Sequence, residues 1–215
     1  MYNIYVFHFF IYWLLLMLLV IIFVILLCLL LIRYHCFNEI AYVKSSIDDK
    51  IYIIRRGSKS QDFLNKSADT LALINLRVLA LIDNLQTTLP DVHWVKILEK
   101  NYSLQDIPII SEAAVDNRYT TFTINKRDIH ICLRTRDQNE RVYNINLLMY
   151  VVLHELAHLC NYTKSNKPIQ GHGPEFREIF KTLVKESIKL NIYNYIDYQN
   201  NPQEYCGVVI NSSIV

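Results

Sequence analysis

The sequence predicts an α+β domain that follows an N-terminal transmembrane helix. Residues 4–32 form a long apolar run without Asp, Glu, Lys or Arg. Apolar residues then recur at helical spacing over residues 63–89, as on the buried side of a helix. Runs rich in β-branched and aromatic residues around 119–134 indicate a β-hairpin and hence a short antiparallel sheet.

The apolar run at residues 4–32 has the length and composition of a membrane-spanning helix. About 20 apolar residues suffice to cross a hydrocarbon core of about 30 Å. A cleaved signal peptide is the alternative, but it has a basic start, a shorter apolar stretch and a small-residue cleavage site. Here no Lys or Arg precedes the run, and Arg33 and Tyr34 follow it. We therefore expect a single-pass membrane protein that contacts lipid through residues 4–32.

The charges near the run predict its orientation. Arg33, Lys44 and Lys50 follow it, and only the α-amino group precedes it, so the positive-inside rule places the C-terminal domain in the cytosol. The five cysteines are odd in number and form no CxxC pair, which favours reduced thiols and agrees with a cytosolic domain. Four glycosylation sequons favour the opposite orientation, at Asn65, Asn101, Asn161 and Asn211.

The remainder of the chain divides into a linker and a folded domain. We interpret residues 33–62 as a juxtamembrane linker, within which Lys50–Arg56 has the composition of a short strand or an interfacial segment. The domain is expected over residues 63–215. Its expected elements are a core helix at 63–89, a shorter helix at 92–100, hairpin strands at 119–125 and 129–134, a buried helix at 146–161, a helix from Pro174 and a last strand at 205–210.

One motif in the predicted buried helix indicates a metal site. The sequence HELAH, from His154 to His158, is an HExxH motif. Residues at i and i+4 project from one face of a helix, so both imidazoles can bind one metal ion. Glu155 lies beside them, where it can act on a water molecule at the metal. Two histidines and a glutamate are costly to bury unless they are paired or bind metal, and we therefore predict a Zn²⁺ site here.

A catalytic zinc site needs a third protein ligand and one open position. We expect His172, which lies in the sequence GHGPEF. The chain has only four glycines, and two of them flank this histidine, where they permit close approach and unusual backbone angles. Pro174 suits the first position of the next helix. Glu175 and Glu178 are the alternative third ligands.

HELAH followed by GHGPEF resembles the SprT-like metallopeptidases, known as the Spartan group, and the related WLM group. The hairpin TTFTINKRDIHICLR and the closing NPQEYCG are similar to segments of predicted WLM-like peptidases of large DNA viruses. The resemblance covers about residues 63–215. It implies a small zincin-like metallopeptidase domain, with zinc bound by a third histidine that follows the HExxH helix. The interval before His172 is closer to the SprT-like pattern than to the WLM pattern.

Motif and resemblance together predict a membrane-anchored zinc endopeptidase that hydrolyses protein or peptide substrates. Its zinc ligands would be His154, His158 and His172, and Glu155 would be the general base. The resemblance also implies that a hairpin strand aligns an extended substrate by strand addition. An oxyanion donor is also needed, but the sequence does not assign one: Tyr162 and Tyr205 are candidates, and a packing role explains each of them more simply.

Two alternatives remain at this stage. The family resemblance allows a protease that degrades proteins crosslinked to DNA, but a formal net charge of +2 argues against nucleic acid as a partner. The second alternative is a non-catalytic membrane scaffold with structural zinc. Such sites usually have four protein ligands that include cysteine, and Cys160 lies two residues after His158.

Overall fold

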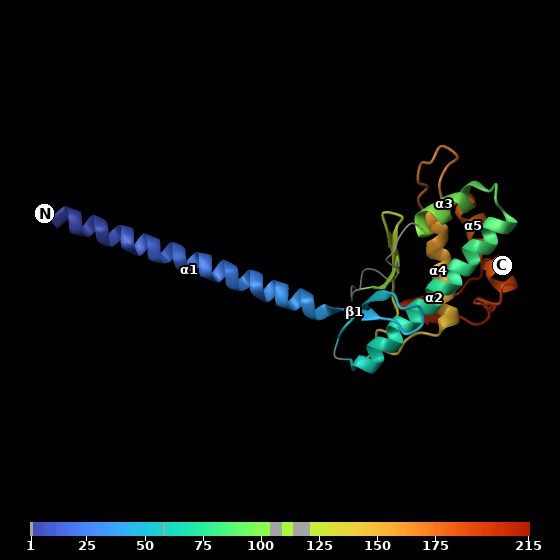
Figure 1. Ribbon diagram of the computed structural model, residues 1–215, viewed down its shortest axis with the longest axis horizontal. Helices are drawn as coiled ribbons and strands as arrows, with labels where there is room; N and C mark the ends of the chain where they lie inside the picture. Colours follow the sequence, from blue (N-terminus) through green and yellow to red (C-terminus); the bar gives the residue numbers. More distant parts are fainter. Residues whose placement is uncertain (1, 58, 104–108, 114–120) are drawn as a thin grey trace. The chain divides into compact units, whose positions relative to one another are not determined.

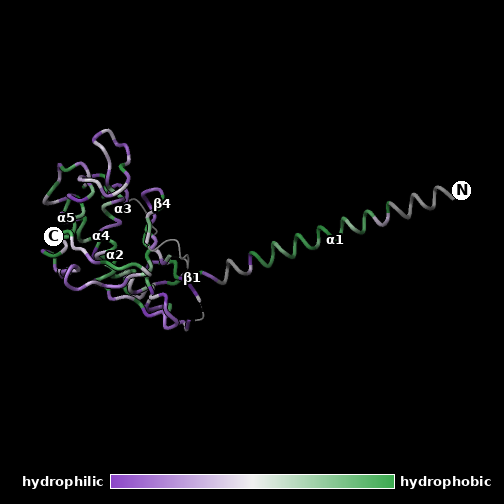
Figure 2. Tube along the Cα trace, turned by 180° about the vertical axis from the view of Figure 1, so that it is seen from behind, coloured by the Kyte–Doolittle hydropathy of each residue, from purple (hydrophilic) through white to green (hydrophobic). Residues whose placement is uncertain are grey.

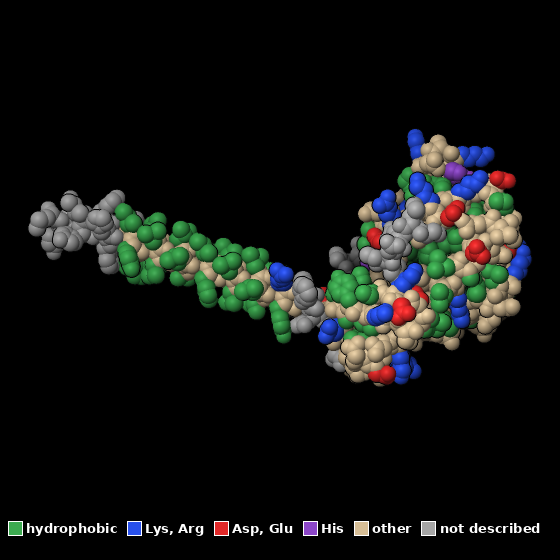
Figure 3. All heavy atoms as spheres, viewed as in Figure 1, with side chains coloured by type: hydrophobic (Ala, Val, Ile, Leu, Met, Phe, Trp, Pro, Cys, Tyr) green, Lys and Arg blue, Asp and Glu red, His purple; other side chains and the backbone are tan. Residues whose placement is uncertain are grey.

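The computed structural model describes residues 2–57, 59–103, 109–113 and 121–215, which form two separate units, 1–40 and 41–215. The first unit is helix α1 (Tyr2–Glu39; Figure 1). Its residues 11–32 are exposed and carry no charged side chain, so the helix is apolar on every side up to Arg33 (Figures 2 and 3). A helix that is hydrophobic all round requires an apolar environment. By length and composition, Ile11–Tyr34 is a candidate membrane span.

The second unit begins with two strands inside the segment predicted to be a linker, residues 33–62. Strands β1 (Ile40–Lys44) and β2 (Ile51–Arg55) form a two-stranded sheet. Every second side chain is buried because successive side chains of a strand point to opposite faces of the sheet, and one face packs on the core. The linker prediction is therefore corrected, and the folded unit starts at Ala41. The buried strand residues are Ala41, Val43, Tyr52 and Ile54.

The next two helices confirm their predictions. Helix α2 (Gln61–Thr88) begins after Ser60, whose hydroxyl accepts a hydrogen bond from the backbone N–H of Phe63. This is an N-cap, which satisfies one of the free amides at the start of a helix. The helix ends just before Pro90, which cannot continue it. Helix α3 (His93–Ser103) follows after a short turn.

The central sheet has the strand order β3–β5–β4. Strands β4 (Phe122–Ile124) and β5 (Asp128–Ile131) pair in antiparallel fashion, which confirms the predicted hairpin; residues 119 and 120 lie outside the described residues. Strand β3 (Ile110–Glu112) pairs parallel to β5. The sheet is therefore mixed, whereas an antiparallel sheet was expected. The prediction missed β3 because a strand of three residues is too short to leave a pattern in the sequence.

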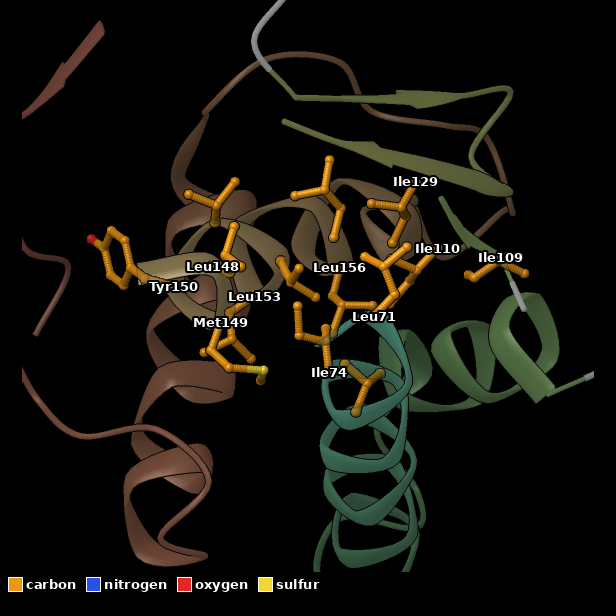
Figure 4. Close-up of a cluster of buried hydrophobic side chains, with 14 of the residues drawn as sticks. Leu71, Ile74, Ile109, Ile110, Ile129, Leu148, Met149, Tyr150, Leu153 and Leu156 are labelled. Carbon is orange, nitrogen blue, oxygen red and sulfur yellow. The ribbon is translucent and has the colours of Figure 1, made fainter. Parts of the chain in front are cut away.

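Helix α4 (Ile145–Cys160) lies at the centre of the domain and confirms the predicted buried helix. The Asn144 side chain caps it by accepting a hydrogen bond from the Asn146 amide. The helix contacts α2, α3, β4, β5 and α5 (Pro174–Lys189), which explains its continuous apolar sequence. Figure 4 shows part of this core, with residues of α4 beside those of α2, β3 and β5. The labelled core residues include Leu71, Ile74, Ile110, Ile129, Leu153 and Leu156.

The C-terminal segment forms a hairpin, where a single strand at 205–210 was expected. Strands β6 (Gln203–Tyr205) and β7 (Val208–Ile210) are antiparallel. Cys206 and Gly207 between them have φ values of 52° and 85°. Two consecutive residues with positive φ make the type I′ turn that suits a two-residue hairpin loop.

A disulfide joins Cys206 in this turn to Cys132, directly after β5, over a sequence separation of 74. The prediction that all five cysteines are reduced is therefore wrong for this pair. The spacing of the two residues in sequence does not reveal that the hairpin turn returns beside β5. Closing a loop of this size stabilises a fold by about 4 kcal/mol, because the unfolded chain is restricted.

A buried ion pair connects the first strands to the central sheet. Arg134 Nε and Nη2 lie 2.7 and 2.8 Å from the two carboxylate oxygens of Glu112. Glu112 also accepts a hydrogen bond from the Arg55 amide at 2.8 Å, and Arg134 donates to the Arg55 carbonyl. Burial raises the pKa of Glu112, and the neighbouring Arg134 opposes this shift. The network thus joins β2, β3 and the segment after β5.

Candidate metal site and catalytic groove

Three imidazoles converge at the C-terminal half of α4. His154 and His158 lie on successive turns of the helix, and His172 comes from the loop before α5. Their Nε2 atoms are 3.2 Å (154–158), 3.0 Å (158–172) and 3.1 Å (154–172) apart. The structure therefore brings together the three histidines predicted as ligands. Among the described residues, this cluster includes neither Glu175 nor Glu178.

The triangle of nitrogen atoms suits a metal ion better than hydrogen bonding. Each Nε2 of a neutral imidazole either donates or accepts a hydrogen bond. Among three mutually adjacent atoms, at least two must then be of the same kind and repel each other at 3.0–3.2 Å. A tetrahedral zinc with Zn–N bonds of about 2.0–2.1 Å separates its ligand nitrogens by about 3.3–3.4 Å. The residues present fit such an ion.

Burial also keeps two of the imidazoles in the form that binds metal. Burial, followed by the proximity of His158 and His172, lowers the pKa of His154 to about 3. Burial, His172 and Lys126 lower the pKa of His158 to about 4. Both rings are therefore neutral at physiological pH, as metal coordination requires.

Phe176 supports all three imidazoles from the first turn of α5. Its ring centroid lies 4.9, 4.4 and 4.7 Å from those of His154, His158 and His172. The side chain is 3% exposed, so it restricts the orientations of the rings it contacts. From the sequence, Phe176 was expected only to help start the helix. Its contact with the three histidines was not expected, although its place in the sequence GHGPEF could have indicated it.

Glu155 is 6% exposed and is held by the edge strand of the sheet. The Thr123 hydroxyl on β4 donates a hydrogen bond to its Oε2 at 2.7 Å. Burial raises the pKa of Glu155, and the hydrogen bond from Thr123 opposes the shift. Sequence reasoning missed Thr123, which lies two residues after Thr121, a residue that lines the groove described below.

We expect the substitution Thr123→Val to lower kcat/KM for peptide cleavage by about 10- to 100-fold. A hydrogen bond to a charged group contributes about 1.5–3 kcal/mol, and valine removes it while keeping the size of the side chain. Initial rates at matched zinc content measure the effect. Thr123→Ser retains the hydroxyl and is the control. Equal rates for the valine variant and the wild type would show that Glu155 needs no support from β4.

Lys126, in the turn between β4 and β5, fastens the end of the metal-binding helix. Its Nζ donates hydrogen bonds to the carbonyl groups of His158 (2.7 Å), Asn161 (2.9 Å) and Ile169 (3.2 Å). A cation at a helix C-terminus is favoured by the helix dipole. These bonds also fix the start of the loop that carries His172. In the sequence, Lys126 is marked only by its place between the two predicted hairpin strands.

A groove with a volume of about 430 Å³ adjoins the histidines and contains Glu155. Tyr205 lines it, and the Tyr205 hydroxyl lies 2.5 Å from Thr121 Oγ1. Tyr162, the other candidate oxyanion donor, lies under the Lys126 ammonium group instead, at 4.7 Å. The remaining groove residues include Tyr150, Val151, Phe176, Arg177, Phe180 and the segment 208–214.

The fold and the site define a class of protein: a small α+β domain whose HExxH helix meets a third histidine from the following loop. The sequence model of the SprT-like family matches residues 101–195, which include all three histidines and Glu155. Residues 101–195 therefore form a SprT-like domain, and this family is associated with metallopeptidase-like function and is typically zinc-dependent.

Viral proteins are among the relatives. Uncharacterized protein R325 of Acanthamoeba polyphaga mimivirus is 36% identical over 181 residues, which cover 83% of this chain and 86% of that protein. Uncharacterized protein 136R of Invertebrate iridescent virus 6 is 33% identical over 40% of this chain and 46% of its own length. Uncharacterized protein 042R of Invertebrate iridescent virus 3 is 37% identical, over 42% and 53% respectively. No solved structure matches the chain significantly.

Proposed function

We propose that this chain is a membrane-anchored zinc endopeptidase with a zincin-like domain. One observation carries the proposal: two imidazoles of α4 and a third from the loop before α5 bring their Nε2 atoms within 3.2 Å of one another, and α4 also carries the buried carboxylate of Glu155. The family match supports the peptidase class, and the apolar helix α1 supports the membrane anchor.

The residues of the site divide the chemistry between them. His154, His158 and His172 would hold the zinc ion, which supplies a Lewis acid that polarises a carbonyl group and makes water a stronger acid. Glu155 accepts a proton from the attacking water and passes it to the nitrogen of the leaving amine. The raised pKa of Glu155 suits a group that both takes up and returns a proton. Thr123 holds the carboxylate in place.

A structural zinc site in a scaffold protein receives less support. Such a site usually has a fourth protein ligand, often cysteine. The Cys160 thiol is buried and donates a hydrogen bond to the Leu156 carbonyl at 3.1 Å. In the part of the chain that the structure describes, the histidine cluster contains no cysteine or carboxylate, so one coordination position is left for substrate or water.

Zinc removal tests the proposal directly. We expect the full chain in detergent to bind one zinc ion, to lose cleavage of an unfolded protein substrate on chelation, and to regain it when zinc is added. His172→Ala should weaken zinc binding by more than about 100-fold, because even loss of a residue behind a ligand costs 10- to 100-fold. Metal analysis and calorimetry measure both. Unchanged zinc affinity in this variant would contradict the assignment of His172.

We further propose that the domain faces the cytosol, because positive charges follow α1. The disulfide favours the opposite side, since disulfides persist in oxidising compartments. The cytosolic orientation predicts no change in electrophoretic mobility on glycosidase treatment of the protein expressed in eukaryotic cells. A shift that disappears when Asn65 and Asn211, both exposed, are replaced by Gln would overturn it. Asn161→Gln is the matched control: because Asn161 is fully buried, this replacement should leave any such shift unchanged.

A further inference from the structure

The segment after Gly207 forms one wall of the catalytic groove. Every residue from Val208 to Ile214 lines it, together with His154 and Glu155. Val208 and Val209 are 46% and 61% exposed. Exposed valines beside a catalytic carboxylate are a surface on which an apolar group can be buried.

Hydrogen bonds fix this wall in place. The Tyr150 hydroxyl donates a hydrogen bond to the Ser212 carbonyl at 3.2 Å. The Tyr198 amide donates to Ser213 Oγ, and this hydroxyl donates to the Ile196 carbonyl, both at 2.9 Å. The disulfide at Cys206 anchors the start of the hairpin. The segment is therefore a firm side of the groove and not a loose chain end that occupies it.

Strand β7 offers an unpaired edge at the same place. It pairs with β6 alone, in the register Glu204↔Val209. Within the described ranges, no backbone–backbone hydrogen bond joins residues 208–214 to any segment other than β6. The free N–H and C=O groups of such an edge can pair with an extended peptide.

Apolar side chains also line the groove on the side of the helices. Val151, Phe176 and Phe180 lie on α4 and α5, and Ile214 closes the C-terminal wall. Among the described residues that line it, Glu155 is the one acidic side chain and Arg177 the one Lys or Arg side chain. A charged substrate side chain packed against Val208 and Val209 would lose hydration without meeting a charged side chain among residues 208–214.

We infer that this groove selects extended polypeptide segments that place a large aliphatic or aromatic side chain against β7, next to the bond that is cut. The inference rests on the proposed peptidase function and specifies its substrate. Large apolar residues are mostly buried in folded proteins, so the substrates would be unfolded chains or exposed apolar segments. The specificity would come from the C-terminal hairpin, outside the residues 101–195 that match the family.

The test begins with the zinc-loaded full chain in detergent and a denatured protein as substrate. Mass spectrometry of the products should show Leu, Ile, Val, Phe or Met enriched about fivefold at one position beside the cut, since an apolar pocket distinguishes side chains by about 10- to 200-fold per methylene group.

Two peptides that differ only at this position, one with Leu and the other with Asn, then give a ratio of kcat/KM values. We expect Val209→Asp to lower this ratio about tenfold. Ile51→Asp is the control, because Ile51 is 55% exposed on β2 and lies outside the groove.

The outcomes separate this inference from the proposed function. If the wild type cuts nothing, the peptidase proposal fails. The groove can still be tested by measuring, with fluorescence anisotropy, how the two peptides bind to the Glu155→Gln variant. Cleavage without an apolar preference would overturn the inference, as would equal Leu/Asn ratios for Val209→Asp and the wild type. A general rise in cleavage by Val209→Asp would also overturn it, because the segment would then be an obstruction and not a binding wall.

Discussion

The substitution Glu155→Gln is expected to reduce cleavage of an unfolded protein substrate by about 10²- to 10⁴-fold, the range for loss of a positioned general acid–base group. Glutamine keeps the size of the side chain and can still contact Thr123, but it cannot accept a proton from water. Glu155 lies outside the cluster of three histidines that would hold the metal, so zinc content should stay at the wild-type level. The effect should therefore appear in kcat and not in metal binding.

Side-by-side assays at equal zinc occupancy measure this effect. Glu175→Gln is the matched control: it removes the same charge near the site, from an exposed residue that is outside the histidine cluster. Its rate should stay within about twofold of the wild type, as expected for a surface change without a catalytic role. Cleavage by Glu155→Gln at the wild-type rate would refute the proposed mechanism, whereas loss of zinc in this variant would assign Glu155 a role in metal binding.

The second large effect is expected at the buried ion pair. Arg134→Met should lower the free energy of unfolding by about 3–5 kcal/mol, because it leaves the Glu112 carboxylate buried without its main partner. The two side chains are 0% and 2% exposed and meet through two short contacts. Urea denaturation followed by circular dichroism measures the change.

An exposed ion pair in the same domain provides the comparison. Lys66 and Asp62 lie 3.0 Å apart on α2, with side chains 73% and 76% exposed. Lys66→Met should cost less than about 1 kcal/mol, since water screens such pairs. The double variant Glu112→Leu/Arg134→Met should recover part of the stability lost in Arg134→Met, because no unpaired charge remains. Similar costs for the single changes at Arg134 and Lys66 would show that burial adds nothing to the inner pair.

The helices could be predicted because each leaves a periodic trace in the sequence. The apolar spacing of α2 and α5 follows from the one face that each buries, and α4 is apolar throughout because protein surrounds it. The convergence of His154 and His158 was equally predictable, since the spacing i, i+4 determines their geometry wherever the helix lies. The position of His172 followed from its glycine neighbours and from the need for a third ligand.

Other features depend on contacts that the sequence does not encode locally. Thr123 and Lys126 reach α4 only because the hairpin packs against that helix, and neither belongs to a motif. Strand β3 joins the sheet through three residues, too few to show a pattern. The pairing of Cys132 with Cys206 likewise depends on the return of the C-terminal hairpin to β5. Each of these features belongs to the tertiary structure, where distant segments meet.

The disulfide between Cys132 and Cys206 has a topological consequence for the catalytic apparatus. It closes a covalent ring that contains α4, the exposed loop at residues 163–172 and α5. A single proteolytic break in that loop would leave two pieces that are still linked. The groove wall and the helix that faces it would then stay in one molecule, so a nicked chain could keep its architecture until a reductant opens the ring.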